Sequence, residues 1–324
     1  MSVSGQPYPL RFVPIYKEKI WGGDNFRSLL GRTLPKGVKV GESWELADLE
    51  EGESVVQNGP WAGMTLRQVT QRLGPSLLGG ARTAPFGRFP LLVKLLDAAE
   101  VLSLQVHPDA RAVAEIGEGE ARPKDECWYV LGSHSGSLCK GLRPGVTPEQ
   151  FREAVLDDSV EEIINRLSVR RGDFHYVPAG TVHALGPGVI AVEIQTPSDT
   201  TYRVTDWGRG RDIHLDQSLQ SIRFRPVDDS PPGAAGDVLV ACAHFTVAKR
   251  KLLGGGTHLY PPGRCTVLTF LGADAPVEVR HADAIEPVTP VGAGDTILLP
   301  AEAAPIEIVS SGTCSWLETT LPER

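Results

Sequence analysis

One short segment places two glycines, a proline and a histidine at a spacing that could present a metal ligand. Gly172 is followed by Pro178, Gly180 and His183. Glycine and proline turn the chain tightly between two strands, and the histidine is then held on a rigid support. The segment predicts a metal site at His183, the alternative being a buried histidine that bonds to backbone.

The same spacing, G-x5-P-x-G-x2-H, resembles the second motif of the cupin superfamily. The first cupin motif carries two histidines and a glutamate, and this chain departs from it because Gln105 precedes His107. The glutamate would be Glu126, which follows a long insertion. The resemblance implies a metal held by these side chains together with His183.

Strand periodicity decides whether these residues can act together, because side chains two positions apart share a face of a strand. Ser103, Gln105 and His107 therefore point one way, and the apolar residues between them point into hydrophobic packing. Lys124 and Glu126 share a face in the same manner.

Two imidazoles, one carboxylate and one amide oxygen form a donor set suited to zinc or another first-row divalent ion. Open positions would remain for water or substrate. We expect one Zn²⁺ per chain, held by Gln105, His107, Glu126 and His183. His175 lies outside the motif, and we interpret it as structural.

Short aliphatic segments separated by turn residues make up most of the chain. The 35 Gly and 26 Pro agree with frequent turns. This pattern predicts a mainly β fold of the sandwich, jelly-roll or barrel type. The expected strands cover residues 89–96, 101–106, 127–131, 189–194, 266–271 and 297–299.

A few segments predict helices. Thr147 and Gln150 form a capping-box opening with proline at the first helical position, and apolar residues then recur at near-helical spacing as far as Leu167. Thr65 with Gln68 and the stretch after Pro108 predict shorter helices.

The stretch 228–236 is too poor in large side chains to belong to a core, and it predicts a domain boundary. We expect a catalytic cupin domain with a helical insertion over 1–230. A smaller cupin-like β domain that lacks metal ligands is expected over 237–324.

An internal repeat supports two related units. Gly294-Asp295 and Pro300 repeat the spacing of Gly172-Asp173 and Pro178, but no histidine follows at the matching place. The expected architecture is therefore two jelly-roll barrels, the second degenerate, with a few α-helices inserted in the first.

Composition restricts the partners. The net charge of -8 argues against nucleic acid, whose phosphates require a basic face. Five scattered cysteines suggest reduced thiols. The chain contains no apolar run of about 18 residues, so the sequence predicts no membrane span, and the amino terminus lacks a targeting pattern. We expect a cytoplasmic protein, monomeric or weakly dimeric, that acts on a small molecule without membrane contact.

Five ordered blocks resemble the signature blocks of type I mannose-6-phosphate isomerases of the short bacterial form. The resemblance is dense from about Pro14 to Arg225 and weak beyond. It implies an isomerase that holds zinc at the four positions given above. The blocks are FPLLVK at 89–94, LSLQVHP at 102–108, ECWY at 126–129, VPAGTVHA at 177–184 and SDTTYR at 198–203.

The resemblance also implies roles for residues around the metal. Arg203 is implied as a catalytic residue beside the reacting carbons, and Lys124 and Glu193 match active-site positions of the family. Pro123 stands where longer relatives have a histidine, so a proton-transfer role assigned to that histidine is not carried over.

Aldose–ketose isomerisation through an enediol needs a group that moves a proton between neighbouring carbons. Glu193 and Lys124 are both candidates, and the sequence does not choose between them. Arg203 could hold enediolate oxygens or phosphate, the alternative being a structural ion pair with Asp199 or Asp206. Ser103 and Lys94 could also contact the phosphate.

We therefore expect a zinc-dependent interconversion of mannose 6-phosphate and fructose 6-phosphate in carbohydrate metabolism. A cupin phosphoglucose isomerase is an alternative that Gln105 disfavours. A non-catalytic, zinc-containing sugar-phosphate sensor is another, which the combination of Lys124, Glu193 and Arg203 disfavours.

Overall fold

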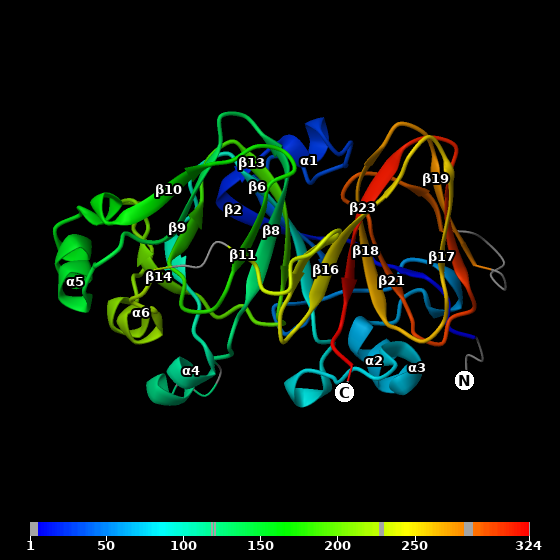
Figure 1. Ribbon diagram of the computed structural model, residues 1–324, viewed down its shortest axis with the longest axis horizontal. Helices are drawn as coiled ribbons and strands as arrows, with labels where there is room; N and C mark the ends of the chain where they lie inside the picture. Colours follow the sequence, from blue (N-terminus) through cyan, green and yellow to red (C-terminus); the bar gives the residue numbers. More distant parts are fainter. Residues whose placement is uncertain (1–5, 118, 120, 227–229, 282–287, 324) are drawn as a thin grey trace. The chain divides into compact units, whose positions relative to one another are not determined.

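The structure is a computed structural model that describes residues 6–117, 119, 121–226, 230–281 and 288–323. The fold is mainly β, as expected, and the strand pairs with a described register are antiparallel (Figure 1). Contacts divide the chain into two compact units. Unit 1 comprises Met1–Ile15, Trp44–Val93 and Pro231–Arg324, and unit 2 comprises Tyr16–Ser43 and Lys94–Ser230.

This division differs from the expected domains of 1–230 and 237–324. The break near residue 230 is present, but residues 1–15 and 44–93 cluster with the carboxy-terminal segment. Hydrogen bonding explains the difference, because Leu10 pairs with Leu298 and the backbone N–H of Ala301 donates to the carbonyl of Leu77. A linear sequence pattern does not reveal such long-range pairing.

Unit 2 contains a five-stranded antiparallel sheet and most of a six-stranded sheet. The five-stranded sheet has the order β10 (Ile164–Ser168), β9 (Ser137–Leu142), β12 (His183–Leu185), β7 (Leu104–Val106) and β14 (Tyr202–Thr205). The six-stranded sheet has the order β11 (Phe174–Val177), β8 (Glu126–Ser133), β13 (Val189–Gln195), β6 (Leu92–Ala98), β2 (Ile15–Gly23) and β3 (Val40–Leu46).

The core of unit 2 lies between these two sheets. Leu96, Trp128 and Val130 contribute from the six-stranded sheet, and Leu138 and Leu185 contribute from the five-stranded sheet. Alternation along each strand sends one set of side chains into this layer. Polar residues at the same inward positions are therefore enclosed as well.

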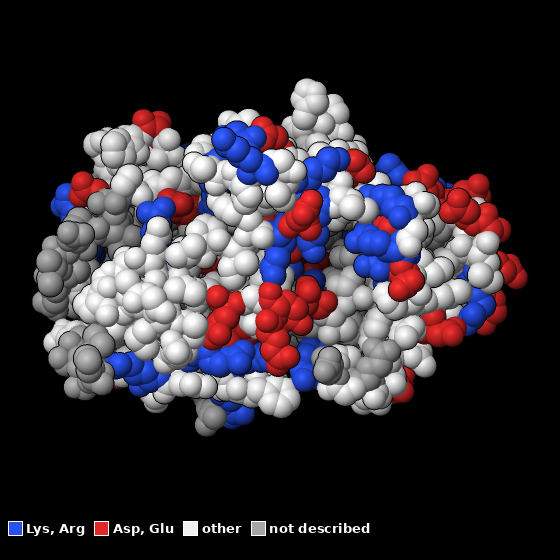
Figure 2. Space-filling view, turned by 180° about the vertical axis from the view of Figure 1, so that it is seen from behind, with Lys and Arg blue, Asp and Glu red and all other residues white. Residues whose placement is uncertain are grey.

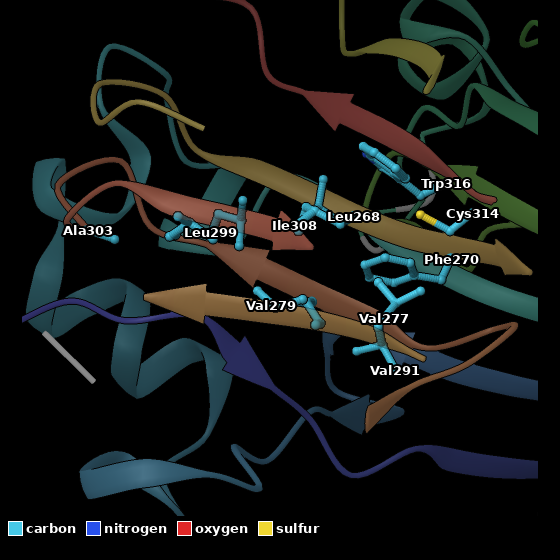
Figure 3. Packing of buried hydrophobic residues seen from close by; sticks show 12 residues of the cluster. Leu268, Phe270, Val277, Val279, Val291, Leu299, Ala303, Ile308, Cys314 and Trp316 are labelled. Atoms are coloured by element: carbon cyan, nitrogen blue, oxygen red, sulfur yellow. The ribbon is translucent and has the colours of Figure 1, made fainter. Parts of the chain in front are cut away.

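Unit 1 repeats the arrangement with a six-stranded and a four-stranded sheet. Their inward side chains form one cluster, in which Phe270 and Trp316 meet Val277 and Ile308 (Figure 3). The six-stranded sheet has the order β1 (Leu10–Arg11), β21 (Thr296–Leu299), β18 (Thr266–Ala273), β23 (Cys314–Thr320), β16 (Thr246–Leu252) and β15 (Val238–Ala241). The four-stranded sheet has the order β17 (Gly256–Tyr260), β22 (Ile306–Ser310), β19 (Val277–His281) and β20 (Val288–Val291), and β4 (Asp48–Leu49) pairs with β5 (Gly52–Glu53).

The predicted helices are present and are short. Both expected capping boxes are formed, by Thr65 with Gln68 and by Thr147 with Gln150. Extension of the second helix to Leu167 is wrong, because the chain leaves the helix after Leu156 and residues from Ile164 onward form β10. The helices are α1 (Asn25–Ser28), α2 (Leu66–Leu73), α3 (Pro75–Leu78), α4 (Ala110–Ile116), α5 (Pro148–Leu156), α6 (Leu215–Ser221), and the 3-10 turns η1 (Gly59–Trp61), η2 (Pro85–Gly87) and η3 (Val160–Glu162).

The sequence repeat corresponds to a repeated local structure. In unit 2, Gly172 N–H donates to the carbonyl of Val130, whose own N–H donates to the carbonyl of Asp173. In unit 1, Gly294, Phe270 and Asp295 make the same two bonds. Both glycines have positive φ, 95° and 84°, which glycine adopts without strain.

This correspondence relates two glutamates, of which Glu193 is buried and Glu318 is partly buried. Two residues before Val130, Trp128 pairs with Glu193, and two residues before Phe270, Leu268 pairs with Glu318. Glu193 and Glu318 are therefore equivalent positions in the two units. A cation lies beside each, Lys94 at Glu193 and Arg250 at Glu318.

The surface and cysteines agree with the composition. Acidic and basic side chains are mixed on the face that Figure 2 draws, without one broad basic area. The five cysteines are free. Within the described ranges, the helices fall short of the length and apolarity needed to cross a membrane.

Candidate active site

The site is built on a row of four side chains across the five-stranded sheet of unit 2. Arg203 on β14 pairs with Gln105 on β7, Gln105 pairs with His183 on β12, and His183 pairs with Lys140 on β9. Register partners on adjacent antiparallel strands project from the same face. The four side chains therefore share one face. Helix α6 lies beside β14, at one side of this sheet (Figure 1).

Glu126 reaches the same place from β8 of the other sheet. Its Oε2 lies 3.2 Å from His107 Nε2, and its Oε1 lies 3.3 Å from His183 Nε2. The three ligand atoms fall within 4.8 Å of one another, and all three side chains are fully enclosed. Two nitrogens and a carboxylate so arranged can share one divalent cation.

Backbone carbonyls fix the orientation of both imidazoles. Nδ1 of His107 lies 3.0 Å from the carbonyl oxygen of Thr200, and Nδ1 of His183 lies 2.8 Å from that of Thr181. A carbonyl only accepts, so each Nδ1 carries the proton and donates it. Both Nε2 atoms are thereby left with a lone pair for a metal, the usual outer support of metal-binding histidines.

Buried atoms without hydrogen bonds test whether a metal fits. His107 Nε2 and Glu126 Oε1 are enclosed and have no hydrogen-bond partner, while Glu126 Oε2 faces the ammonium group of Lys124 at 3.0 Å. Buried polar atoms normally have such partners, and an ion is one accepted reason for exceptions. These orphaned atoms converge on one point, so the residues present fit a cation.

The pKa values favour the ligating protonation states. Burial, helped by nearby Lys124, lowers the pKa of His107 to about 3, and burial also lowers the pKa of His183. Burial alone would raise the pKa of Glu126, but Lys124 and the two histidines outweigh it and hold the value well below the usual range. Neutral imidazoles and an ionised carboxylate are the forms that bind metal.

Gln105 stands beside the three donors. Its Nε2 lies 3.3 Å from His183 Nε2, and its Oε1 accepts a hydrogen bond of 3.3 Å from the hydroxyl of Ser103. Ligation through Oε1 requires the amide to turn about its last bond. Ser103 tolerates both orientations, because a hydroxyl can donate or accept.

Lys124 and Glu193 lie near the donors in different surroundings. Lys124 Nζ is 3.0 Å from Glu126 Oε2. Glu193 has both oxygens engaged, since Trp128 Nε1 donates to Oε1 at 2.9 Å and Lys94 Nζ lies 3.2 Å from Oε2. Burial raises the pKa of Glu193 in spite of the Lys94 charge.

Lys94 is enclosed by acidic groups. In addition to Glu193, its Nζ lies 3.8 Å from Glu42 and 3.9 Å from Asp199. Burial alone would lower the pKa of Lys94, but Glu193 and Glu42 outweigh burial and raise it. The lysine is thus a permanently charged partner of carboxylates.

The Arg203 guanidinium is hydrogen-bonded through Nη1 and forms no ion pair with a described residue. Its Nη1 donates to the carbonyl of Asp212 at 2.6 Å, and its Nε is buried without a hydrogen-bond partner. Asp206, one candidate for a structural ion pair, is bonded instead by Arg209 and Arg211. The guanidinium therefore keeps a donor for a ligand, which supports the functional interpretation.

Comparison with known proteins identifies the family. The family described as phosphomannose isomerase type I, catalytic domain, matches residues 10–153. Mannose-6-phosphate isomerase ManA of Bacillus subtilis (strain 168) is 36% identical over 265 residues, which cover 77% of this chain and 81% of the relative. The mannose-6-phosphate isomerase of Streptococcus mutans is 36% identical over 249 residues, 73% of this chain and 77% of the relative.

The chain belongs to the type I phosphomannose isomerase family. Its fold agrees with that of a solved relative along almost the whole length. The crystal structure of mannose 6-phosphate isomerase from Bacillus subtilis has a TM-score of 0.83 and 29% identity, and the match covers 96% of this chain and 99% of the other. The chain is accordingly a member of a family of sugar-phosphate isomerases with a buried metal-binding triad.

Most residues that the sequence singles out lie together in this site. The structure gathers the four expected ligands, and Ser103, Lys124, Glu193 and Lys94 lie around them, with Arg203 in the same row. His175 lies on β11 outside the triad.

Sequence reasoning missed Lys140 and Glu42. Lys140 is only 5% exposed, and it lies in a strand of mostly small and apolar residues. A lysine in such a strand can be noticed in the sequence as a candidate buried residue. That it lies next to His183 is known only from the register of the paired strands. Glu42 lies on β3, far from every motif in the sequence.

Proposed function

We propose that the chain interconverts mannose 6-phosphate and fructose 6-phosphate with the help of one zinc ion. The observation that carries the proposal is the convergence of His107, Glu126 and His183, where His107 Nε2 and Glu126 Oε1 are buried without a hydrogen-bond partner. The donor set of two imidazoles, one carboxylate and the Gln105 amide suits zinc. The names of the relatives supply the substrate pair.

In the proposed reaction, a base removes the proton from C2 of the aldose, and the proton returns to C1 of the resulting enediol. A proton also moves between the two oxygens, so the atoms of substrate and product balance. Bound zinc would polarise these oxygens and stabilise negative charge on them.

Lys124 is better placed than Glu193 to move the carbon-bound proton. Its Nζ lies beside the carboxylate that completes the triad, whereas both oxygens of Glu193 already have partners. In this arrangement Glu193 keeps Lys94 in position. Replacing Lys124 or Glu193 by its uncharged isostere distinguishes the role of base from that of positioning Lys94. The variant that lacks the base should lose turnover even when zinc remains bound.

Arg203 would hold the enediolate. It lies one strand from Gln105 in the row of the site, and its buried Nε is available to an oxygen of the ligand. A guanidinium remains charged and donates parallel hydrogen bonds to paired oxygens.

A coupled assay with metal analysis tests the proposal. Purified chain should carry close to one zinc per polypeptide and convert mannose 6-phosphate and fructose 6-phosphate in both directions. Glucose 6-phosphate, assayed in parallel, should be converted far more slowly. Zinc-loaded protein that is inactive on both proposed substrates would refute the proposal, and preference for glucose 6-phosphate would indicate a phosphoglucose isomerase.

A further inference from the structure

We propose that His214 is a positioning residue that anchors Arg203. This inference rests on the proposed function, in which Arg203 holds the enediolate. It begins from the place of Arg203 in the fold. β14 is the outer strand of the five-stranded sheet, so its backbone pairs with β7 on one side only. Backbone groups at the outer side of such a strand need partners from elsewhere.

The pairing of β14 with β7 is irregular at Arg203. Arg203 pairs with Gln105, but the register shifts before Thr205 pairs with Leu104. A bulge of this kind bends the strand and re-aims the side chains next to it. Hydrogen bonds to β7 therefore do not by themselves fix the direction of the Arg203 side chain.

His214 binds both backbone groups of Arg203. The N–H of His214 donates to the carbonyl of Arg203 at 2.7 Å, and the N–H of Arg203 donates to Nδ1 of the His214 ring at 3.0 Å. The N–H and C=O of one strand residue point to the same side, so both groups face away from β7. A single histidine thus takes the place of a neighbouring strand at this position.

The second of these bonds sets the protonation state of the ring. A backbone N–H only donates, so Nδ1 of His214 must carry a lone pair. His107 and His183 have the opposite arrangement, because their Nδ1 atoms face carbonyl oxygens. The His214 side chain therefore acts as an acceptor, and another side chain with an oxygen in the same place can replace it.

The segment around His214 also holds the guanidinium. The carbonyl of Asp212 accepts a hydrogen bond of 2.6 Å from Nη1 of Arg203. His214 is itself fixed, because its carbonyl accepts from Ser218 N–H in the first turn of α6, and its ring lies edge-on to that of Tyr202 at 6.1 Å. Arg203 is thus bound at three points to one short segment at the start of α6.

Fixed geometry matters for the role proposed for Arg203. A group that stabilises charge developing on the substrate is effective only when it is oriented before the reaction. A displacement of about 1 Å can lower turnover about 100-fold. Loss of the acceptor at His214 should therefore lower kcat, with less effect on the binding of the substrate in its ground state.

The test removes the acceptor and the ring of His214 separately. His214→Asn keeps an oxygen at the position of Nδ1 and loses the ring, whereas His214→Phe keeps a ring beside Tyr202 and loses the acceptor. We expect His214→Phe to lower kcat for mannose 6-phosphate about 10- to 100-fold, with KM changed less than about threefold and zinc content unchanged. His214→Asn should stay within about threefold of the wild type, as should the control Asp216→Asn, at an exposed residue of the same helix.

A double-variant cycle shows whether His214 acts through Arg203. In protein that carries Arg203→Ala, the further change His214→Phe should lower kcat less than about twofold, because the group to be positioned is gone. A ring that serves packing alone predicts the opposite order, with His214→Phe active and His214→Asn impaired. That order, or losses that multiply in the double variant, would overturn the inference.

Backbone amide exchange provides a readout that does not depend on turnover. By mass spectrometry, a peptide that contains Arg203 should exchange faster in His214→Phe than in the wild type or His214→Asn, because the amide has lost its acceptor. An inactive wild type that still shows this difference refutes the proposed function but retains the anchoring of Arg203. An active wild type with unchanged exchange and kcat in His214→Phe overturns the inference.

A second variant without the acceptor guards against misfolding of His214→Phe. The His214 side chain is half-buried, so His214→Ala introduces no overpacking. The same fall in kcat and the same faster exchange are expected. Wild-type turnover in His214→Ala contradicts the inference whether or not His214→Phe folds.

Discussion

The ammonium nitrogen of Lys94 lies 3.2 Å from Oε2 of Glu193, and both side chains are almost completely buried. Trp128 donates to the other oxygen of the carboxylate. Charges removed from water in this way stabilise each other only while both are present, and removal of one leaves the other uncompensated. The pair therefore makes the structure around the metal ligands dependent on Lys94.

Replacement of Lys94 by methionine tests this dependence. We expect the free energy of unfolding, measured by urea denaturation of metal-loaded protein, to fall by about 3–5 kcal/mol. The double variant Lys94→Met/Glu193→Gln should recover much of that loss, because neither charge of this pair remains. Lys39→Met, at an exposed pair with Glu100, is the control and should change little. A loss in Lys94→Met no larger than in this control would contradict the prediction.

Removal of a metal ligand should abolish zinc binding and activity together. For His107→Ala and His183→Ala, we expect zinc content by atomic absorption to fall to background, with turnover lost in parallel. His134→Ala, at an exposed histidine outside the site, should retain both. Full activity of metal-free His183→Ala protein would show that the ligand assignment is wrong.

Arg203→Ala should separate catalysis from metal binding. Loss of a group that stabilises developing charge typically lowers turnover about 10²- to 10³-fold. Zinc content should remain unchanged, because Arg203 lies two strands away from the ligand His183 and does not belong to the triad. Steady-state kinetics with zinc analysis checks both points. A drop in zinc equal to the drop in turnover would instead indicate a structural role.

Glu318 predicts a pH dependence of stability in unit 1. Burial alone would raise its pKa, but hydrogen bonds from Arg250 and Tyr260 outweigh burial and lower it. A carboxylate whose folded pKa is depressed stabilises the fold above its unfolded pKa of about 4.3 and loses that contribution as pH falls. Glu318→Gln should therefore be less stable than wild type by about 1–3 kcal/mol at pH 7, and the difference should shrink below about pH 4.5.

Urea denaturation at pH 7, 4.5 and 3.5 checks this expectation. Glu323→Gln serves as the control, because Glu323 pairs with Arg264 at the surface and should contribute little at any of these pH values. A difference between Glu318→Gln and wild type that is the same at pH 7 and pH 3.5 would contradict the assigned sign.

Local patterns in the sequence predicted much of the candidate site. Alternation placed Gln105 and His107 on one face and Lys124 and Glu126 on another, and both faces meet at the triad. The turn motif before His183 was sufficient because glycine at positive φ and proline restrict the backbone locally. These signals need no knowledge of which strands pair.

Features that depend on strand pairing could not be predicted. Lys140 neighbours His183 only through the register of β9 and β12, and Glu42 reaches Lys94 from a strand more than fifty residues away in sequence. The helix that begins at Pro148 ends at Leu156, before the predicted Leu167, for a related reason. Residues from Ile164 onward have helical spacing, but Ile164 pairs with Leu142 and the segment forms a strand. Tertiary context here overrides a weak local preference.

Because the segments of the two units alternate along the chain, the units become able to fold at different times during synthesis. All segments of unit 2 have left the ribosome once Ser230 has emerged, whereas unit 1 waits for β23, which pairs with both β16 and β18 in the middle of its sheet. Nascent domains generally fold as units when their segments become available. The residues within 44–93 that bond to the carboxy-terminal segment, such as Leu77 with Ala301, must therefore wait for these partners while the metal ligands already have theirs, and a chaperone would find its substrate in that interval.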